Sequence, residues 1–167
     1  MAVKRFALIS DTHGAVHPSL HEMLRGVHTV LHAGDVGGEN VLMELGLHCS
    51  VIAVAGNVDG TGPNLPLQRV VDLPFGKAAL AHGHLVPPGR ETVARHLFET
   101  FEPHGTRLIV TGHSHLPALQ YRKGSYLVNP GSAGRPRFGA GASLCMMDWD
   151  EETDLFRFDF RPLDWSR

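Results

Sequence analysis

The sequence predicts an α/β fold in which two β-sheets pack face to face with helices on the outside. In the N-terminal part, apolar strand-like runs alternate with amphipathic helix-like segments, which is typical of parallel strands joined by helical crossovers. After residue 115 the pattern changes to short strands joined by turns. No linker divides the 167 residues, and this length suits one core, so we expect a single domain over residues 1–167.

The first part of the chain is predicted to contain three parallel strands and two helices. Each strand segment contains a run of apolar residues without a polar face, as expected of strands buried on both sides. The helix segments carry apolar residues three and four positions apart. We expect strands at 3–9, 27–32 and 51–55 and helices at 18–25 and 39–47.

A loop rich in glycine and proline, residues 59–66, leads into the second part. The next two strands are predicted to form an antiparallel hairpin, because the connection through residues 74–76 is too short for a crossover. A helix follows, and the later strands include one in which phenylalanines alternate with polar residues. We expect the hairpin at 69–73 and 77–82, the helix at 91–101, and strands at 108–110, 118–121, 126–128, 142–149 and 155–160.

Composition narrows the class of protein. The apolar fraction is 43%, which is ordinary for a soluble globular domain. A net charge of −2 does not favour bulk attraction to nucleic acid or to a membrane surface. No segment approaches the roughly 20 apolar residues that a membrane helix needs. Cys49 and Cys145 form no cysteine framework, so we expect buried free thiols and a cytoplasmic location.

Five predicted strands each end in a metal-binding residue type beside a glycine. In an open α/β sheet the carboxyl ends of the strands form the ligand crevice, so these side chains are expected to meet. One such coincidence carries little weight, but five in chain order indicate a site. The segments are Asp11-Thr12-His13-Gly14, Gly34-Asp35, Gly56-Asn57, His82-Gly83-His84 and Gly112-His113-Ser114-His115.

The number of candidate ligands exceeds what one four-coordinate ion uses. Carboxylate, amide and imidazole groups without a thiolate fit two divalent ions that share a bridging carboxylate. Manganese is our first expectation, with nickel, cobalt, zinc and iron as alternatives. Such a pair acidifies bound water and clamps a phosphate ester. The candidates are Asp11, His13, Asp35, Asn57, His82, His113 and His115.

The order of these motifs resembles the calcineurin-like metallophosphoesterases. The small size and the segment Asn129-Pro130-Gly131-Ser132 are similar to the compact bacterial and archaeal phosphodiesterase branch, whose fold is shared by the retromer metallophosphoesterase-like subunit. The resemblance implies a four-layer αββα fold and hydrolysis of a small-molecule phosphoester, most simply a diester, by metal-activated hydroxide. It also implies ligand roles: Asp11, His13 and His115 for one ion, Asn57, His82 and His113 for the other, and Asp35 as the bridge.

The sequence departs from many relatives at Val58. Relatives often carry there a histidine that is thought to protonate the leaving group, and valine cannot transfer a proton. The resemblance therefore leaves the general acid open, with His84 as the substitute donor beside the ligand His82. Asp35 and Asn57 are expected to take part in catalysis, and Asn57 and His84 in substrate binding. Arg137 matches the family's phosphate-binding segment; its alternative is a solvated loop residue.

Two other functions stay open. A protein-interaction scaffold could keep the fold, although a pure scaffold need not keep seven matched ligands. A nuclease is disfavoured because the chain is mildly acidic and has no basic stripe, so strong nucleic-acid binding is not expected. We expect no membrane partner, and a homo-oligomer is compatible with the sequence. His17 and His21, four residues apart, are interpreted as surface residues of the first helix.

Overall fold

Two five-stranded sheets form the centre of the structure, a computed structural model that describes residues 2–137 and 139–166. The first sheet has the order β10-β9-β1-β2-β3 and the second has the order β4-β5-β6-β8-β7. The first contains β1 (Val3–Ile9), β2 (Thr29–His32), β3 (Ser50–Ala53), β9 (Ala142–Asp150) and β10 (Leu155–Leu163). The second contains β4 (Gln68–Leu73), β5 (Gly76–Ala81), β6 (Thr106–Val110), β7 (Ala118–Arg122) and β8 (Ser125–Asn129).

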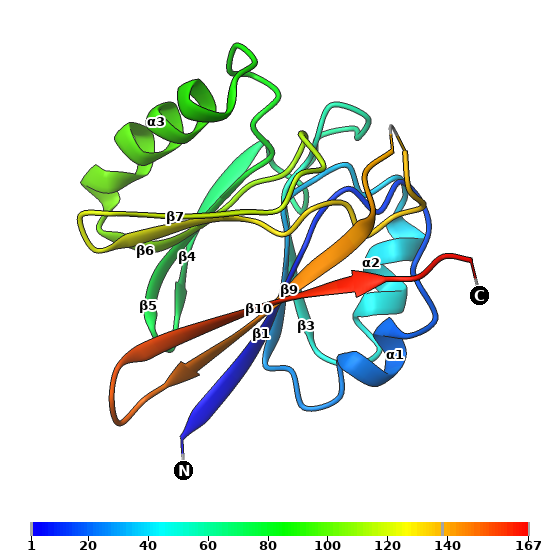
Figure 1. The fold of residues 1–167 in the computed structure, drawn as a ribbon, viewed down its shortest axis with the longest axis horizontal. Helices are drawn as coiled ribbons and strands as arrows, with labels where there is room; N and C mark the ends of the chain where they lie inside the picture. Colours follow the sequence, from blue (N-terminus) through cyan, green and yellow to red (C-terminus); the bar gives the residue numbers. More distant parts are fainter. Residues whose placement is uncertain (1, 138, 167) are drawn as a thin grey trace.

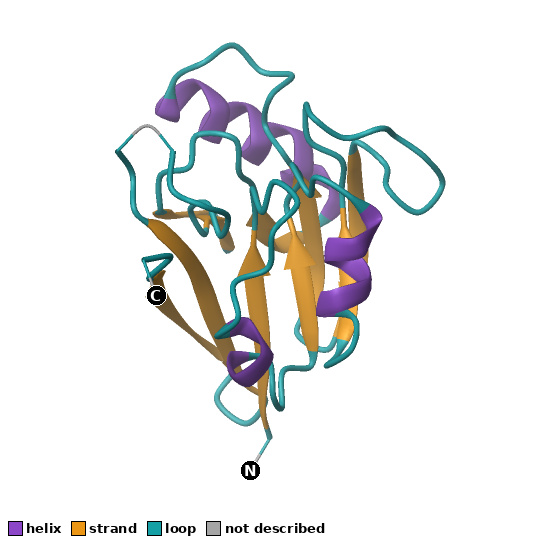
Figure 2. Cartoon of the chain, turned by 90° about the vertical axis from the view of Figure 1, so that its right-hand side faces the viewer, coloured by secondary structure: helices purple, strands orange, loops and turns teal. Residues whose placement is uncertain are grey.

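Helices cover the two outer faces of this pair of sheets. Helices α1 (Leu20–Met23) and α2 (Glu39–Leu45) lie on one side and α3 (Arg90–Phe101) lies on the other, where a 3-10 turn, Glu102–His104, follows it (Figure 1). Turned by 90°, the molecule shows α1 and α2 against the strands of the first sheet (Figure 2). The predicted four-layer αββα sandwich is therefore confirmed.

Three apolar clusters explain why the layers adhere. Phe6 and Leu8 of β1 point between the two sheets, whereas Ala7 and Ile9 point toward α1 and α2. Strand β6 alternates in the same way between the central layer and the underside of α3. Because successive side chains of a strand face opposite sides, a strand covered on both faces must be apolar throughout. This requirement produces the uniformly apolar runs seen in the sequence.

Strand directions bring the two halves of the candidate site to one end of the molecule. Strands β1, β2 and β3 are parallel to one another, as predicted, and β5, β6 and β8 are parallel in the second sheet. The predicted hairpin of β4 and β5 is present. The carboxyl ends of β1, β2, β3, β5 and β6 all lead into loops that carry candidate ligands.

The later strands are divided between the sheets in a way that the sequence pattern does not predict. Strands β7 and β8 form a hairpin in the second sheet, but β9 and β10 form a hairpin in the first, where β9 pairs antiparallel with β1. The first helix is also shorter than the predicted 18–25, because only Leu20–Met23 is helical. Leu20 and Leu24 nevertheless reach the core, so the apolar spacing is explained by burial.

The two cysteines are free, as predicted, but only Cys145 is buried, while Cys49 is half-buried. Burial disfavours the thiolate and raises the pKa of Cys145 to about 12. In the described part of the chain, no helix is long and apolar enough to cross a membrane.

Candidate metal centre

The first group of candidate ligands comes from the loops after β1 and β6. Nε2 of His115 lies 3.1 Å from Oδ1 of Asp11 and 3.4 Å from Nε2 of His13. Nε2 of His13 lies 3.8 Å from the same Asp11 oxygen. One ligand atom from each of the three residues thus lies within 4.8 Å of the others, which is a geometry that could hold a metal ion.

The second group comes from the loops after β2, β3, β5 and β6. Nε2 of His82 lies 3.3 Å from Oδ2 of Asp35, and these two residues form a cluster of metal-binding geometry with His113. Oδ1 of Asn57 lies 3.1 Å from His82 Nε2 and 3.1 Å from His113 Nδ1. Asn57 therefore adds a fourth oxygen or nitrogen donor to this cluster.

Asp35 lies between the two groups. Its Oδ2 is 3.8 Å from Nε2 of His13 in the first group and 3.3 Å from Nε2 of His82 in the second. Its other oxygen, Oδ1, accepts a hydrogen bond from the backbone N–H of Val58. The position fits the bridging role that the sequence resemblance implies.

The arrangement of hydrogen-bond donors and lone pairs around His82 suits a bound cation. Its Nδ1 donates to the carbonyl of Ala33 at 2.8 Å, so in a neutral ring Nε2 carries a lone pair. That lone pair faces oxygens of Asn57, Asp35 and Asp11. Oδ1 of Asp11 is buried and makes no hydrogen bond among the described residues. Lone pairs that converge without a donor between them are the arrangement that a bound cation stabilises.

Backbone strain is concentrated at the same residues. Seven non-glycine residues in the described part of the chain have positive φ, and five of them are candidate ligands. Non-glycine residues rarely adopt this conformation, and it costs free energy that the surrounding structure must offset. The positive φ values also explain how His113 and His115, which are one residue apart on either side of Ser114, belong to different groups, because neither residue is in the extended conformation. The φ values are 55° at Asp11, 48° at His13, 50° at Asp35, 68° at His113 and 59° at His115.

Two glycines in the motifs allow the loops to approach one another closely. A Cβ at Gly112 would collide with Oγ of Ser10 and would lie 2.6 Å from Oδ2 of Asp11. A Cβ at Gly56 would collide with the Asp35 carboxylate. These two glycines are therefore required by packing, because a side chain at either position would occupy the space of a neighbouring loop.

Asp59 holds two ligand loops together and was not predicted to do so. Its carboxylate accepts hydrogen bonds from the N–H groups of Val36, Gly37 and Gly56 at 2.9–3.0 Å. These bonds fix the loop of Asp35 against the loop that carries Asn57. The only signal in the sequence was its position two residues after Asn57.

Two further supporting residues come from distant segments. Nδ2 of Asn129, at the end of β8, donates to the carbonyl of Gly112 and to Oγ of Ser114, each at 3.0 Å. Oγ of Ser132 donates to the carbonyl of Asp11. The segment 129–132 was noted in the sequence only for its resemblance, and the structure shows that it supports the ligand turns.

Electrostatics favour ionised carboxylates at the centre. Burial opposes ionisation of Asp35, but contact with His82 and the Val58 N–H outweighs burial and holds its pKa at about 2. For His82 burial also opposes the charge, yet contact with Asp35 and the charge of Asp11 raise its pKa. A site that stabilises positive charge at this point is suited to cations.

A model of the calcineurin-like phosphoesterase superfamily domain matches residues 5–152. The chain belongs to this superfamily. A probable metallophosphoesterase of Methanothermobacter thermautotrophicus is 31% identical over 136 residues, which cover 78% of this chain and 77% of the relative. Phosphodiesterase YfcE of Escherichia coli K12 is 31% identical over 107 residues, which cover 60% of this chain and 53% of that protein.

A likeness to a solved structure extends over almost the whole chain. Vacuolar Protein Sorting 29 of Cryptosporidium parvum matches with a TM-score of 0.74 and 23% identity, covering 96% of this chain and 97% of the other. At this identity the likeness shows the fold alone. It confirms that the calcineurin-like phosphoesterase sandwich is the architecture of this chain.

Three further residues that the sequence singles out lie near the candidate ligands. Val58 and Arg137 line a depression of about 690 Å³ together with His13. Both Arg137 and Val58 are exposed there, and the charge of Arg137 acts on His13. The ring of His84 lies 5.4 Å from that of His82 and 6.3 Å from that of His113, measured between centroids. The structure therefore brings all three next to the clustered ligands.

The prediction for His17 is wrong. His17 is buried rather than superficial, lies outside α1, and packs edge-on against Trp165. Its Nδ1 contacts Oγ of Ser19 and its Nε2 donates to the carbonyl of Asp164, so it fastens the C-terminal segment. His21 is half-exposed and contacts His48 and Glu44.

Proposed function

We propose that this member of the phosphoesterase superfamily is a dinuclear metal-dependent phosphodiesterase. Asp11, His13 and His115 hold one divalent ion, Asn57, His82 and His113 hold the other, and Asp35 bridges them. The position of Asp35 supports the proposal most strongly, because one of its oxygens lies within 3.8 Å of an imidazole nitrogen from each group. Manganese is the proposed ion, since mixed oxygen and imidazole ligands suit it.

The protein's own groups would position the ions and the phosphate. Two bound divalent ions supply Lewis acidity, which acidifies water and neutralises charge on the phosphoryl oxygens. The Asp59 carboxylate accepts a hydrogen bond from the N–H of Gly56, which fixes the backbone next to Asn57. Asn57 presents its amide beside the second group. Arg137 presents a guanidinium in the depression next to His13, where it would pair with a phosphoryl oxygen.

A diester is preferred over a monoester as substrate class. The similarity to phosphodiesterase YfcE supports this choice. In addition, Val58 stands where many relatives carry a histidine, so the leaving oxygen has no strong proton donor at that point. Such a site suits esters whose leaving group departs as a stable anion.

His84 is proposed as a substrate contact and as the donor nearest to the missing histidine. Burial and the neighbouring His82 and His113 lower the pKa of His84. A lowered pKa leaves the imidazole mainly neutral at neutral pH, so little of it is in the protonated form that acts as a general acid. The proposal therefore assigns His84 a hydrogen bond to the substrate and only a minor share of proton transfer.

Protein purified without chelators tests the activity directly. Metal content is measured by mass spectrometry, and hydrolysis of bis(4-nitrophenyl) phosphate is followed with and without Mn²⁺. We expect about two ions per chain, no turnover after dialysis against a chelator, and recovery when Mn²⁺ is added. Full activity after verified removal of metal would contradict the proposal.

A scaffold is the second candidate function, because a Vps29 structure shares the fold. The same experiment separates the two. A scaffold predicts no turnover of any diester even when two ions are bound, whereas the phosphodiesterase predicts turnover that rises with metal occupancy.

A further inference from the structure

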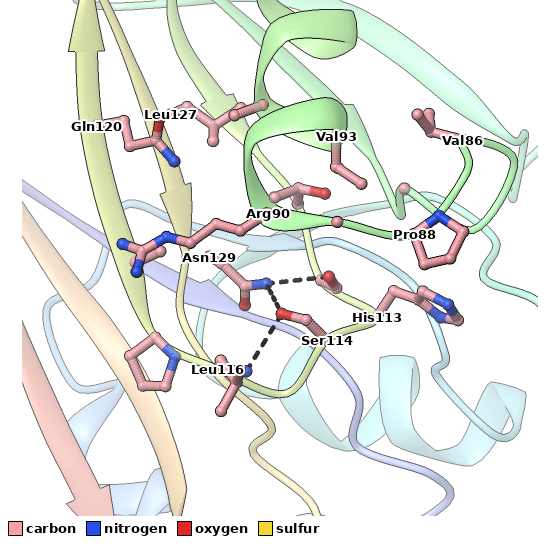
Figure 3. A pocket seen from close by; sticks show the side chains of 17 residues that line it. Val86, Pro88, Arg90, Val93, His113, Ser114, Leu116, Gln120, Leu127 and Asn129 are labelled. Atoms are coloured by element: carbon pink, nitrogen blue, oxygen red, sulfur yellow. Dashed lines mark hydrogen bonds between the residues drawn. The ribbon is translucent and has the colours of Figure 1, made fainter.

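A second pocket lies beside the candidate metal centre, where His113 lines it rather than His13 and Arg137. It has a volume of about 360 Å³, within the roughly 300–1,000 Å³ of small-ligand pockets. The pocket lies between the start of α3, strand β7 and the loop after β6 (Figure 3). Its walls are mainly apolar and include Val86, Pro88, Val93, Leu116 and Leu127.

His113 is common to this pocket and to the candidate metal centre. Its Nδ1 lies 3.1 Å from Oδ1 of Asn57, within the second ligand group, while the same residue forms part of the pocket wall. Gly112, whose backbone packs against Asp11, also lines the pocket. A phosphoryl group at the ions would therefore lie at the mouth of this pocket.

The pocket's polar groups near the centre are already engaged. Asn129 donates to Ser114 and to the carbonyl of Gly112, and Ser114 accepts from the N–H of Leu116 (Figure 3). These groups need no ligand to satisfy them. What the inner wall offers a ligand is apolar surface, and burial of apolar surface is favourable.

The centre thus lies between two depressions of different character. The one with His13 brings the charged groups Asp59 and Arg137 together with apolar side chains, whereas the one with Val86 and Leu116 is lined mainly by apolar groups. A phosphodiester carries two ester groups, one on each side of the phosphorus. Two unlike depressions on either side of the ions match two unlike ester groups.

We propose that the apolar pocket is a specificity subsite that receives an uncharged, ring-sized apolar ester group of the substrate. The proposal rests on the phosphodiesterase function proposed above and names the substrate class. Val86 and Leu116 are the specificity-determining residues, because both line the pocket and neither is a proposed ligand. Arg90, on the far side of the pocket from His113, is not required for the preference (Figure 3).

Binding of two phosphonates tests the subsite without relying on turnover. Methylphosphonate and cyclohexylphosphonate carry the same anionic group and differ only in apolar size. Calorimetric titration of the Mn²⁺-loaded protein should give a Kd about tenfold lower for the cyclohexyl compound, since each buried methylene adds affinity and part of the gain is lost to ordering. A cyclohexyl ring has no π-face, so a cation–π contact with Arg90 does not contribute.

Variants assign the preference to the pocket. The double substitution Val86→Ala and Leu116→Ala should reduce the tenfold preference to about twofold and leave methylphosphonate binding unchanged. Leu116 is 59% exposed, so its truncation does not threaten folding. Leu119→Ala is the matched control, because Leu119 is a 43% exposed leucine three residues after Leu116 that does not line the pocket. Arg90→Gln should keep the preference.

Several results would overturn the subsite. These are equal Kd values for the two phosphonates, a preference that persists in the double variant, a preference that disappears in Arg90→Gln, or no binding of either compound. Hydrolysis of bis(4-nitrophenyl) phosphate by the same metal-loaded preparation reports on the proposed function separately. Turnover without a phosphonate preference would reject the subsite and retain the phosphodiesterase.

Discussion

The backbone N–H of Val58 donates a 3.0 Å hydrogen bond to Oδ1 of Asp35. The backbone of residue 58 thus holds the proposed bridging carboxylate, while its side chain, 53% exposed, points into the depression that His13 and Arg137 also line. Backbone and side chain have separate roles at this position. A change of side chain can therefore alter the chemistry without removing the contact that orients Asp35.

Val58→His should supply the general acid that the parent lacks. Across a series of aryl diesters, rates of the parent enzyme should fall steeply as the pKa of the leaving group rises. The variant should show a flatter dependence, because general acid catalysis contributes about 10²–10⁴-fold where the leaving group is poor. Val58→Ala is the control and should keep the steep slope. A flat slope in the parent, with chemistry rate-limiting, would show that an acid is already present.

Asp35→Asn should harm activity more than any other single change among the seven proposed ligands. The amide keeps the shape and can still accept from Val58, but it loses the charge that serves both ions. We expect a loss of at least about 10²-fold in kcat/KM and a lower metal content per chain. Mass spectrometry and steady-state kinetics measure both, and circular dichroism checks the fold. Wild-type metal content and rate would exclude the bridge.

Asp59→Ala should weaken metal binding although Asp59 is not a proposed ligand. Removing its carboxylate frees three backbone N–H groups and loosens the loops of Asp35 and Asn57. Loss of such a supporting residue typically lowers metal affinity by about 10–100-fold. Titration with Mn²⁺ of the chelator-treated protein measures the change. Asp72→Ala, which removes only a surface ion pair with Lys77, should bind Mn²⁺ like the wild type.

Arg137→Ala should raise KM for diesters with little change in kcat, because a phosphate contact made in both ground and transition states contributes to binding alone. We expect an increase of about 10–100-fold, the size of one lost charge-assisted hydrogen bond. Arg135→Ala is the matched control, since Arg135 stacks on Trp165 instead. An unchanged KM for every accepted diester would make Arg137 a surface residue.

His32 should make the fold sensitive to acid. Burial lowers the pKa of His32 from 6.5 to about 4, with opposing effects of Asp11 and Asp59. The neutral ring accepts from the N–H of Gly34 at Nδ1 and donates to Thr12 from Nε2. Its contribution to stability is therefore present above pH 6.5 and is lost as pH falls toward 4. The shift of the His32 pKa corresponds to a loss of about 3 kcal/mol in the free energy of unfolding between these two pH values.

Urea unfolding in the presence of a chelator, at several values between pH 4 and 7, measures this dependence. His32→Gln should be less stable at pH 7 but should lose less stability on acidification, because glutamine does not titrate. His104→Gln, at an exposed position, should retain the wild-type slope. An unchanged slope in His32→Gln would assign the acid sensitivity to other groups.

The sequence by itself determined the strands that precede the candidate ligands and the type of side chain at each strand end. These features are local: the part of a strand that is buried on both faces, such as 6–9 of β1 or 108–110 of β6, must be apolar, and its carboxyl end opens into a loop. The order Asp11, Asp35, Asn57, His82, His113 could therefore be assembled from spacing and residue type alone. The same reasoning predicted the hairpin of β4 and β5, because its turn is short.

Only the tertiary structure decided how these pieces combine. The choice of β1 as partner for β9 depends on long-range burial of both faces of β9, which a strand pattern does not specify. The division of His113 and His115 between two ligand groups depends on positive φ values that neighbouring loops enforce. Asp59 and Asn129 bind backbone groups that lie up to 23 and 17 residues away in the sequence, so spacing alone does not reveal these supporting roles. The apolar pocket exists because a helix, a strand and a loop from separate segments meet beside His113, and no single segment encodes that space.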